Sequence, residues 1–281
     1  FAVPVGGAGA ITGTLVKILE AHGGAVEVGS RVEEIVLDGK KAVAVKTAKG
    51  EEIRVRQAVM ADTAAATLYL SLLDRGALPG FAVRKMERFA QGWGTFKVDW
   101  ALNAPVPWTC EAAREGAVVH TGDSLEDLSE FTSQVRGGGL PQNPYLVIGQ
   151  QSLADPSRAP AGKHTLWAYS RVPNTMEGGW SRHAEAMGDM IDARIEALAP
   201  GFRQTVLERR VVSPRDLEDM DENLVGGDLG GGSNAWNRQL IFRPLFPWFR
   251  NRTPIKRLYL CSSYTHPGAG VHGMCGYHAA R

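Results

Sequence analysis

A run of small residues near the carboxyl end constrains this chain more than any other feature. Residues 258–260 are typical of a short apolar strand, and the loop after them carries glycines at positions 268, 270, 273 and 276. Glycine lets a backbone adopt positive φ and approach a ligand closely. The residues after Gly273 are typical of a helix start, whose free N–H groups favour an electron-rich or anionic partner. Strand, loop and helix start together predict a cradle for a ligand.

The composition excludes several classes of protein. The chain has 281 residues, 44% of them hydrophobic, which is enough for one large or two ordinary domains. A formal net charge of +1 argues against a nucleic-acid partner bound through overall charge. No run of about 18 apolar residues occurs, so no membrane span is expected. Three scattered cysteines argue against a disulfide framework and favour a reducing, cytoplasmic setting.

The first part of the chain predicts a helix followed by a β-meander. Thr12 is expected to cap a helix whose apolar face holds Leu15, Ile18 and Leu19. Strands are expected over residues 25–28, 31–37, 41–47 and 52–60, with turns between them. Phe1 is not a natural start, so we expect the chain to be a piece of a longer protein, cut at both ends.

Residues 63–227 combine strand and helix patterns. Strands are expected over residues 95–103, 117–120, 145–151 and 164–171. Helices are expected over residues 64–73 and from a cap at Ser181 to Ala199, with Met187, Ile191 and Ile195 on one face. This block predicts a mixed or antiparallel sheet backed by helices, and its place in the chain suggests a substrate-binding domain.

A basic and aromatic segment precedes the last strand. Residues 238–257 hold six basic side chains and no acidic one, and Phe242, Leu245, Phe246, Trp248 and Phe249 are interleaved among them. Such a segment suits peripheral contact with an anionic membrane surface or a route for an apolar substrate. It also suits a surface loop whose aromatic rings point inward. The sequence leaves these alternatives open.

Three other clusters predict no chemistry. Cysteine and histidine at positions 261, 266, 272, 275 and 278 are possible zinc ligands, but their spacing lacks a Cys-x-x-Cys pair, so no metal site is expected. The acidic residues within 216–222 are expected to form a solvated loop. The amino-terminal glycines resemble a dinucleotide fingerprint but have Thr12 where its third glycine belongs.

Several segments together resemble the phytoene-desaturase-like family of flavin-dependent oxidoreductases, which includes carotenoid desaturases. The matching segments are residues 4–13, 26–35, 58–62, 213–233 and 258–276, of which the last is the most specific. The resemblance implies a mixed α/β fold. A partial glutathione-reductase-like FAD-binding domain would be formed by residues 1–62 and 228–281, with a substrate-binding domain inserted at residues 63–227.

The resemblance also implies which residues contact FAD. The strand that holds Val32 would contact the adenine through its backbone, and the loop of residues 265–273 would lie beside the isoalloxazine ring. The expected cofactor-binding residues are Val32, Thr265, His266, Pro267, Gly268, Gly270, Val271 and Gly273. A reduced flavin is anionic, which a helix N-terminus favours.

The implied activity is transfer of a hydride from an apolar, polyene-like small molecule to N5 of FAD, with no catalytic residue assigned. The family's phosphate-binding segment does not occur in these 281 residues. We therefore expect weak or no flavin binding, and no activity, from this chain alone. Alternatives are an amine-oxidase-like flavoprotein and a non-enzymatic Cys/His metal-binding or interaction module.

Overall fold

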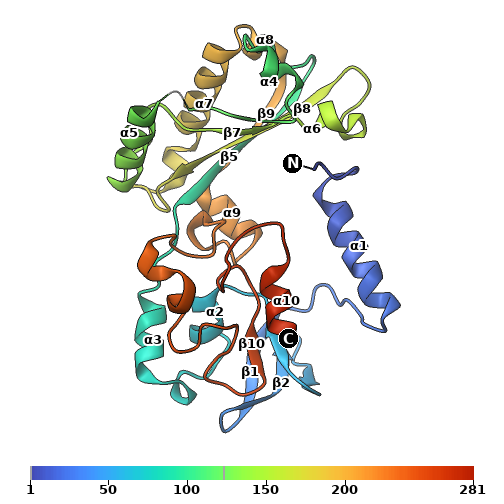
Figure 1. Cartoon of the computed structure of the whole chain (residues 1–281), viewed down its shortest axis with the longest axis vertical. Coiled ribbons are helices and arrows are strands. Elements are labelled where there is room, and N and C mark those ends of the chain that lie inside the picture. Colours follow the sequence, from blue (N-terminus) through green and yellow to red (C-terminus); the bar gives the residue numbers. More distant parts are fainter. Residues whose placement is uncertain (1, 123) are drawn as a thin grey trace. The chain divides into compact units, whose positions relative to one another are not determined.

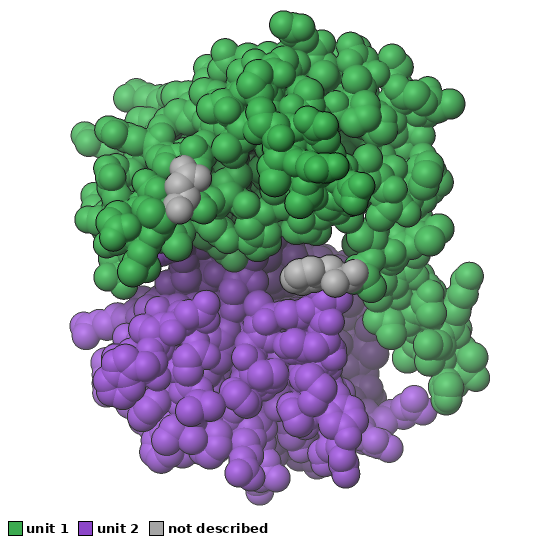
Figure 2. All heavy atoms as spheres, turned by 45° about the horizontal axis from the view of Figure 1, so that its top comes forward, with its two compact units in different colours: residues 1–26, 94–217 green, residues 27–93, 218–281 purple. Residues whose placement is uncertain are grey.

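The computed structural model describes residues 2–122 and 124–281. They form two compact units (Figure 2): unit 1 comprises residues 1–26 and 94–217, and unit 2 comprises residues 27–93 and 218–281. These limits follow internal packing. The division into a cofactor-binding part, residues 1–62 and 228–281, and a substrate-binding part, residues 63–227, is a division by function and stays a prediction.

Unit 1 is built on a five-stranded antiparallel sheet with the strand order β6-β7-β8-β5-β9 (Figure 1). Its strands are β5 (Gly94–Leu102), β6 (Val118–His120), β7 (Val147–Gly149), β8 (His164–Val172) and β9 (Val206–Val212). β5 and β8 pair along their whole lengths, from Gly94 opposite Val172 to Leu102 opposite His164. The predicted mixed α/β class with an antiparallel sheet is confirmed.

Helix α7 (Ala184–Leu198) packs on this sheet through the predicted face, since Met187, Ile191 and Ile195 are all fully buried. The predicted start at Ser181 is wrong. A separate 3₁₀ turn, η3 (Trp180–Arg182), precedes the helix. The reason is packing, because Trp180 is buried in the core with its ring 5.6 Å from that of Phe96.

The remaining short helices of unit 1 lie in the connections between strands. They are α4 (Glu111–Glu115), α5 (Leu125–Arg136), α6 (Gln151–Ala154), η2 (Pro156–Arg158) and α8 (Phe202–Thr205), and α9 (Pro214–Met220) leads into unit 2. The expectation of a solvated loop over residues 216–222 is wrong for its first part, which is helical. Ser213 and Asp216 form a capping box at the start of α9: the Asp216 carboxylate accepts bonds of 2.7 Å from the N–H and the hydroxyl of Ser213, and the Asp216 N–H donates to the Ser213 hydroxyl oxygen (3.3 Å).

The first helix, α1 (Ala8–Ala21), differs from its prediction in two ways. Gly7, with a φ of 86°, precedes the helix, so it begins before Thr12. None of its residues is buried, and Leu15 and Ile18 are 61% and 52% exposed. The expected strand over residues 25–28 does not form. No helix in residues 2–122 and 124–281 combines the length and apolar character that a bilayer span needs.

Unit 2 contains the predicted meander, a second small sheet and several short helices. β1 (Val32–Asp38), β2 (Lys41–Thr47) and β3 (Glu52–Arg54) form an antiparallel sheet. β4 (Val59–Ala61) pairs in parallel with β10 (Leu258–Leu260), so the strand expected over residues 52–60 is divided between two sheets. The helices are α2 (Ala65–Leu70), η1 (Arg75–Ala77), α3 (Gly80–Glu87), η4 (Val225–Gly227), η5 (Trp236–Arg238), η6 (Leu240–Phe242) and α10 (Met274–Ala280).

The core of unit 2 joins segments from both ends of its sequence. Ile35 of β1, Leu68 of α2, Leu258 of β10 and Tyr264 are each at most 2% exposed and belong to one apolar cluster. Backbone bonds add to this, since Ala42 donates to Lys256 (3.0 Å) and Lys256 donates to Lys40 (2.8 Å). The meander and the carboxyl-terminal loop therefore share one folded body.

The helix–sheet packing of unit 1 predicts a large loss of stability from one truncation. Replacing the fully buried Ile191 by alanine should lower the free energy of unfolding by about 2–5 kcal/mol, because the removed methyl groups leave a cavity. Leu207→Ala, at a site 55% exposed on β9, is the matched control and should change stability by less than about 0.5 kcal/mol. Urea unfolding followed by tryptophan fluorescence measures both. Equal effects would contradict this packing.

Candidate functional site

The glycine loop, residues 261–273 between β10 and α10, has a buried side and an exposed side. Ser262, Tyr264, Thr265 and Gly268 are buried. Residues 266–267 and 269–273 are exposed. The loop is therefore held from within, and most of its predicted ligand-contacting residues face solvent.

Thr265 lies on the buried side and has a structural role. It is 1% exposed, its hydroxyl donates to the Ser262 carbonyl (2.8 Å), and it accepts from the Asn251 amide (3.1 Å). The hydroxyl of Thr265 thus makes its hydrogen bonds inside the protein. Only its position in the backbone can shape the exposed side.

The other predicted residues of the loop lie on or next to its exposed side. His266 and Pro267 are exposed, and Val271 is 96% exposed. Gly268 has a φ of 99° and Gly273 a φ of 65°, a backbone region that favours glycine. Gly273 is the residue before α10, and a Cβ placed on it would meet no atom within 4 Å.

Val32 is the predicted residue outside the loop. It begins β1, is 36% exposed and lies opposite Thr47 of β2. Among the hydrogen bonds of the described residues, none joins Val32 to residues 265–273. The structure places both in unit 2.

An apolar hollow of about 340 Å³ lies beside the exposed side of the loop. Its lining residues are Leu240, Ile241, Phe249, Arg250, Asn251, His266 and His278. His266 is the predicted cofactor residue that this hollow includes. The basic and aromatic segment therefore supplies much of the wall next to the loop.

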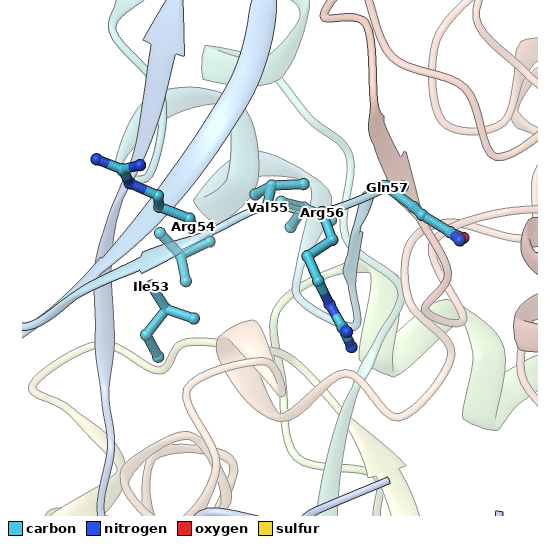
Figure 3. A pocket seen from close by; sticks show the side chains of 8 residues that line it. Ile53, Arg54, Val55, Arg56 and Gln57 are labelled. Carbon is cyan, nitrogen blue, oxygen red and sulfur yellow. The ribbon is translucent and has the colours of Figure 1, made fainter. Parts of the chain in front are cut away.

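Two larger hollows of unit 2 contain none of the predicted cofactor residues. One, of about 590 Å³, is lined by Val45 and residues 53–59, and Figure 3 shows the side chains of Arg54 and Arg56 extending in different directions from this segment. The other, of about 720 Å³, is lined by residues 247–250 and 252–259.

Three residues that the sequence did not single out are buried in this region: Asp228, Arg243 and Asn251, all at most 4% exposed. Arg243 and Asn251 bond directly to the glycine loop, and Asp228 bonds to the nearby residues 230 and 232. Asn251 donates from its side-chain amide to the carbonyls of Leu260 (2.9 Å) and Cys275 (3.2 Å) as well as to Thr265. A single aspartate in the glycine run of residues 226–232 was a usable signal, because glycines leave N–H groups free for a carboxylate. No such signal marks Arg243, because a run of basic residues predicts side chains exposed to solvent.

Burial dominates the electrostatics of this region. It raises the pKa of the Cys261 thiol to about 11, with a smaller contribution from Asp62. Burial also raises the pKa of Tyr264, whose hydroxyl donates to the Asn223 carbonyl (3.1 Å), and lowers that of Arg243. The thiol of Cys275 is buried and contacts the carbonyls of Gly268 (3.5 Å) and Thr265 (3.7 Å). The raised pKa keeps the Cys261 thiol in its protonated, unreactive form.

The cysteines and histidines of the carboxyl-terminal segment do not gather into a metal site. Across the part of the chain that the structure describes, no group of three or more His, Cys, Asp or Glu side chains is placed to hold an ion. This geometry gives no support to the alternative of a Cys/His metal-binding module.

Comparison with known proteins gives relatives along nearly the whole chain, although no protein-family model matches it. The chain is 29% identical to a rat protein called pyridine nucleotide-disulfide oxidoreductase domain-containing protein 2, over 98% of this chain and 49% of that protein. It is 28% identical to the lycopene-forming phytoene desaturase of Pseudescherichia vulneris, over 96% of this chain and 53% of that enzyme. The chain thus spans about half the length of these relatives.

Solved structures show the same fold. An oxidoreductase from Methanosarcina mazei matches 97% of this chain and 53% of its own, with a TM-score of 0.67 and 18% identity. Putrescine oxidase matches 99% of this chain and 54% of its own, with a TM-score of 0.53 and 14% identity. The resemblance found in the sequence is confirmed, and the chain is a relative of the phytoene-desaturase-like oxidoreductases.

Proposed function

We propose that this chain is part of an FAD-dependent oxidoreductase that oxidises an apolar, polyene-like substrate. The observation that carries the proposal is the one-sided glycine loop. Its inner side is fixed by buried hydrogen bonds, and its outer side exposes residues 269–273, of which Gly270 and Gly273 carry no side chain. A flat ring can lie closely against such a surface.

The residues present fit a flavin. Gly268 and Gly273 adopt positive φ, so side chains are disfavoured where a ring would approach. The chemistry that FAD supplies when bound is acceptance, at N5, of a hydride from a substrate carbon. The chain's own part is to hold and orient: His266, Pro267, Gly270 and Val271 would border the ring, and the backbone at Val32 would contact the adenine.

The sheet of unit 1 supports an apolar, conjugated substrate. On the face opposite α7, the rings of Trp167 and Tyr169 stack at 5.8 Å with an interplanar angle of 12°. The charged side chains of β5 and β8 beside these rings have partners of their own: Arg171 lies over the Tyr169 ring, and Lys97 forms an ion pair with Asp99. The face therefore offers flat aromatic area, which suits a polyene, and the exposed Glu208 and Arg210 of β9 lie on the same face.

An amine substrate is the second candidate, favoured by the likeness in fold to putrescine oxidase. A protonated amine needs a free carboxylate or an aromatic cage. Asp99 is the acidic residue nearest the ring stack in the strand pairing, opposite Trp167, and it is already paired with Lys97. This pairing makes the apolar substrate the better-supported choice.

We further propose that part of the segment 238–257 contacts an anionic membrane surface, from which an apolar substrate would be drawn. Leu240, Ile241 and Phe246 are 63%, 44% and 52% exposed. Arg238 and Arg250 lie in the same stretch, and among the described ion pairs neither has a carboxylate partner. Exposed apolar side chains flanked by cations suit the interface of an anionic bilayer.

The proposed substrate class predicts the outcome of a reduction experiment. Anaerobic addition of a carotenoid precursor to the flavin-loaded, full-length protein should bleach the visible flavin bands, because hydride transfer reduces the ring. A diamine such as putrescine is the comparison and should leave the spectrum unchanged. Bleaching by the diamine alone would favour the amine-oxidase alternative, and a colourless full-length protein would remove both.

The bare backbone of the glycine loop predicts the effect of adding a side chain. Gly268→Val in the full-length protein should reduce flavin loading at least about tenfold, because residue 268 has positive φ and a Cβ there would lie 3.4 Å from the Arg243 guanidinium. Gly13→Ala, on α1 with no atom within 4 Å of the new Cβ, is the control and should load normally. Absorbance per chain measures both. Normal loading of Gly268→Val would place the flavin elsewhere.

The exposed apolar segment predicts selective vesicle binding. The protein should sediment with vesicles that contain anionic phospholipid and dissociate as salt is raised, because the cations are screened. The double substitution Leu240→Ser and Ile241→Ser should abolish binding, whereas Met220→Ser, at another site 67% exposed, should not. Binding that survives the double substitution would assign the contact to another surface.

A further inference from the structure

Two buried side chains of opposite charge, Asp228 and Arg243, bond to the backbone of the glycine-rich segment that precedes residues 238–257. We call residues 226–232 the Asp228 loop. Asp228 and Arg243 are each 2% exposed. A buried charge costs much free energy unless its hydrogen-bonding groups are paired, so the partners of these two residues define what they do.

The carboxylate of Asp228 is fully occupied by backbone. It accepts bonds of 2.7 Å from the N–H groups of Gly92, Gly230 and Gly232. The loop can turn its amides inward because Gly231 and Gly232 have φ of 66° and 111°, a region that glycine adopts with little steric cost. The negative charge is thereby stabilised at one end of the arrangement.

Arg243 lies on the other side of the same backbone. Its Nη2 group donates to the carbonyls of Gly230 (2.7 Å) and Gly231 (2.9 Å) in the Asp228 loop, and of Ser263 (2.7 Å) in the glycine loop. The peptide groups of Gly230 thus link the two charges, since its N–H donates to Asp228 and its carbonyl accepts from Arg243. The positive end of this paired arrangement is the end that touches the glycine loop.

The guanidinium lies directly beneath Gly268. A Cβ on Gly268 would be 3.4 Å from Nη2 and 3.7 Å from Nε of Arg243. Nε is buried and has no hydrogen-bond partner in the structure. The three hydrogen bonds to backbone carbonyls all come from Nη2, so the buried Nε–H donor and the charge itself are not consumed by that anchoring.

The glycine loop is also anchored by a neutral side chain, that of Asn251. Asn251 joins Leu260, Thr265 and Cys275 through one amide group without any buried charge. Burial lowers the pKa of Arg243, which shows how costly its charge is in this place, although the charge of Asp228 offsets part of the cost. Anchoring alone therefore does not account for an arginine at position 243.

We propose that Arg243 is a positioning residue with an electrostatic role: it fixes the glycine loop and stabilises a ligand that becomes anionic on the loop's exposed side. This rests on the proposed function, in which the ligand is a flavin that gains negative charge on reduction. In a low-dielectric interior a cation acts over a longer range than in water. Arg243 would favour the reduced flavin over the oxidised one and so raise the reduction potential.

The positioning half can be tested without flavin, by hydrogen–deuterium exchange on the chain itself. Arg243→Gln and Asn251→Gly should each speed exchange of residues 262–268 by about tenfold, because each removes anchoring bonds. Glycine is chosen at position 251 because φ there is 60°. Arg252→Gln, an exposed cation of the same segment, is the control and should change nothing. Unchanged exchange in Arg243→Gln would overturn this half.

The electrostatic half needs the flavin-loaded, full-length protein and a redox titration. Arg243→Gln should shift the flavin midpoint potential to more negative values, and Arg243→Lys should retain most of the wild-type value. Asn251→Gly loosens the loop but keeps the charge, so its potential should stay near that of wild type. The electrostatic role is refuted by an unchanged potential in Arg243→Gln, or by an equal shift in Asn251→Gly.

The two measurements separate this proposal from the proposed function. A full-length wild-type protein that binds no flavin would remove the proposed function and the electrostatic half together, while exchange would still decide whether Arg243 positions the loop. Should Arg243→Gln fail to fold, Arg243→Lys and Asn251→Gly still decide the matter. In that case the proposal is contradicted if the flavin midpoint potential shifts in Asn251→Gly but not in Arg243→Lys.

Discussion

The order of unit 2 around its candidate site depends on one network of buried polar groups, in which Asp228 and Arg243 face each other through the backbone of residues 230–232. Three N–H groups point to the carboxylate and three carbonyls to the guanidinium. A buried donor or acceptor left without its partner costs about 1–3 kcal/mol. The Asp228 loop, the residues before β5 and the glycine loop are therefore expected to order together, because each completes the hydrogen bonding of another.

The parts of the fold that the sequence predicted well are those fixed by local pattern. β2 has its predicted limits, residues 41–47, and β5 and β8 are within a residue at each end of theirs. Each of these strands has one face turned to a core and the other less buried, so alternation of apolar and polar side chains is visible in the sequence. The buried face of α7 was predicted for the same reason, at the helical period.

The parts that were missed depend on partners far away in the chain. Residues 52–60 have one continuous strand pattern, but β4 pairs with β10, about two hundred residues later, and the strand is broken where it changes sheet. α1 has a helical apolar stripe that no described residue buries. Arg243 was missed because a basic run predicts solvent exposure, whereas its burial requires carbonyls supplied by residues 230, 231 and 263.

For the site, the glycine pattern predicted where backbone lies bare but not which way each side chain points. Thr265 was expected to face the cofactor, yet its hydroxyl is bonded to Ser262 and Asn251 inside the protein. The loop can be both rigid and bare only if its hydrogen bonding is completed on one side. Asn251 and Arg243 do this from beneath, one without charge and one with it. A site that only had to bind a neutral ring would be served by two neutral anchors. Under the proposed function, the charged anchor is therefore the feature that matches this geometry to a ligand whose charge changes.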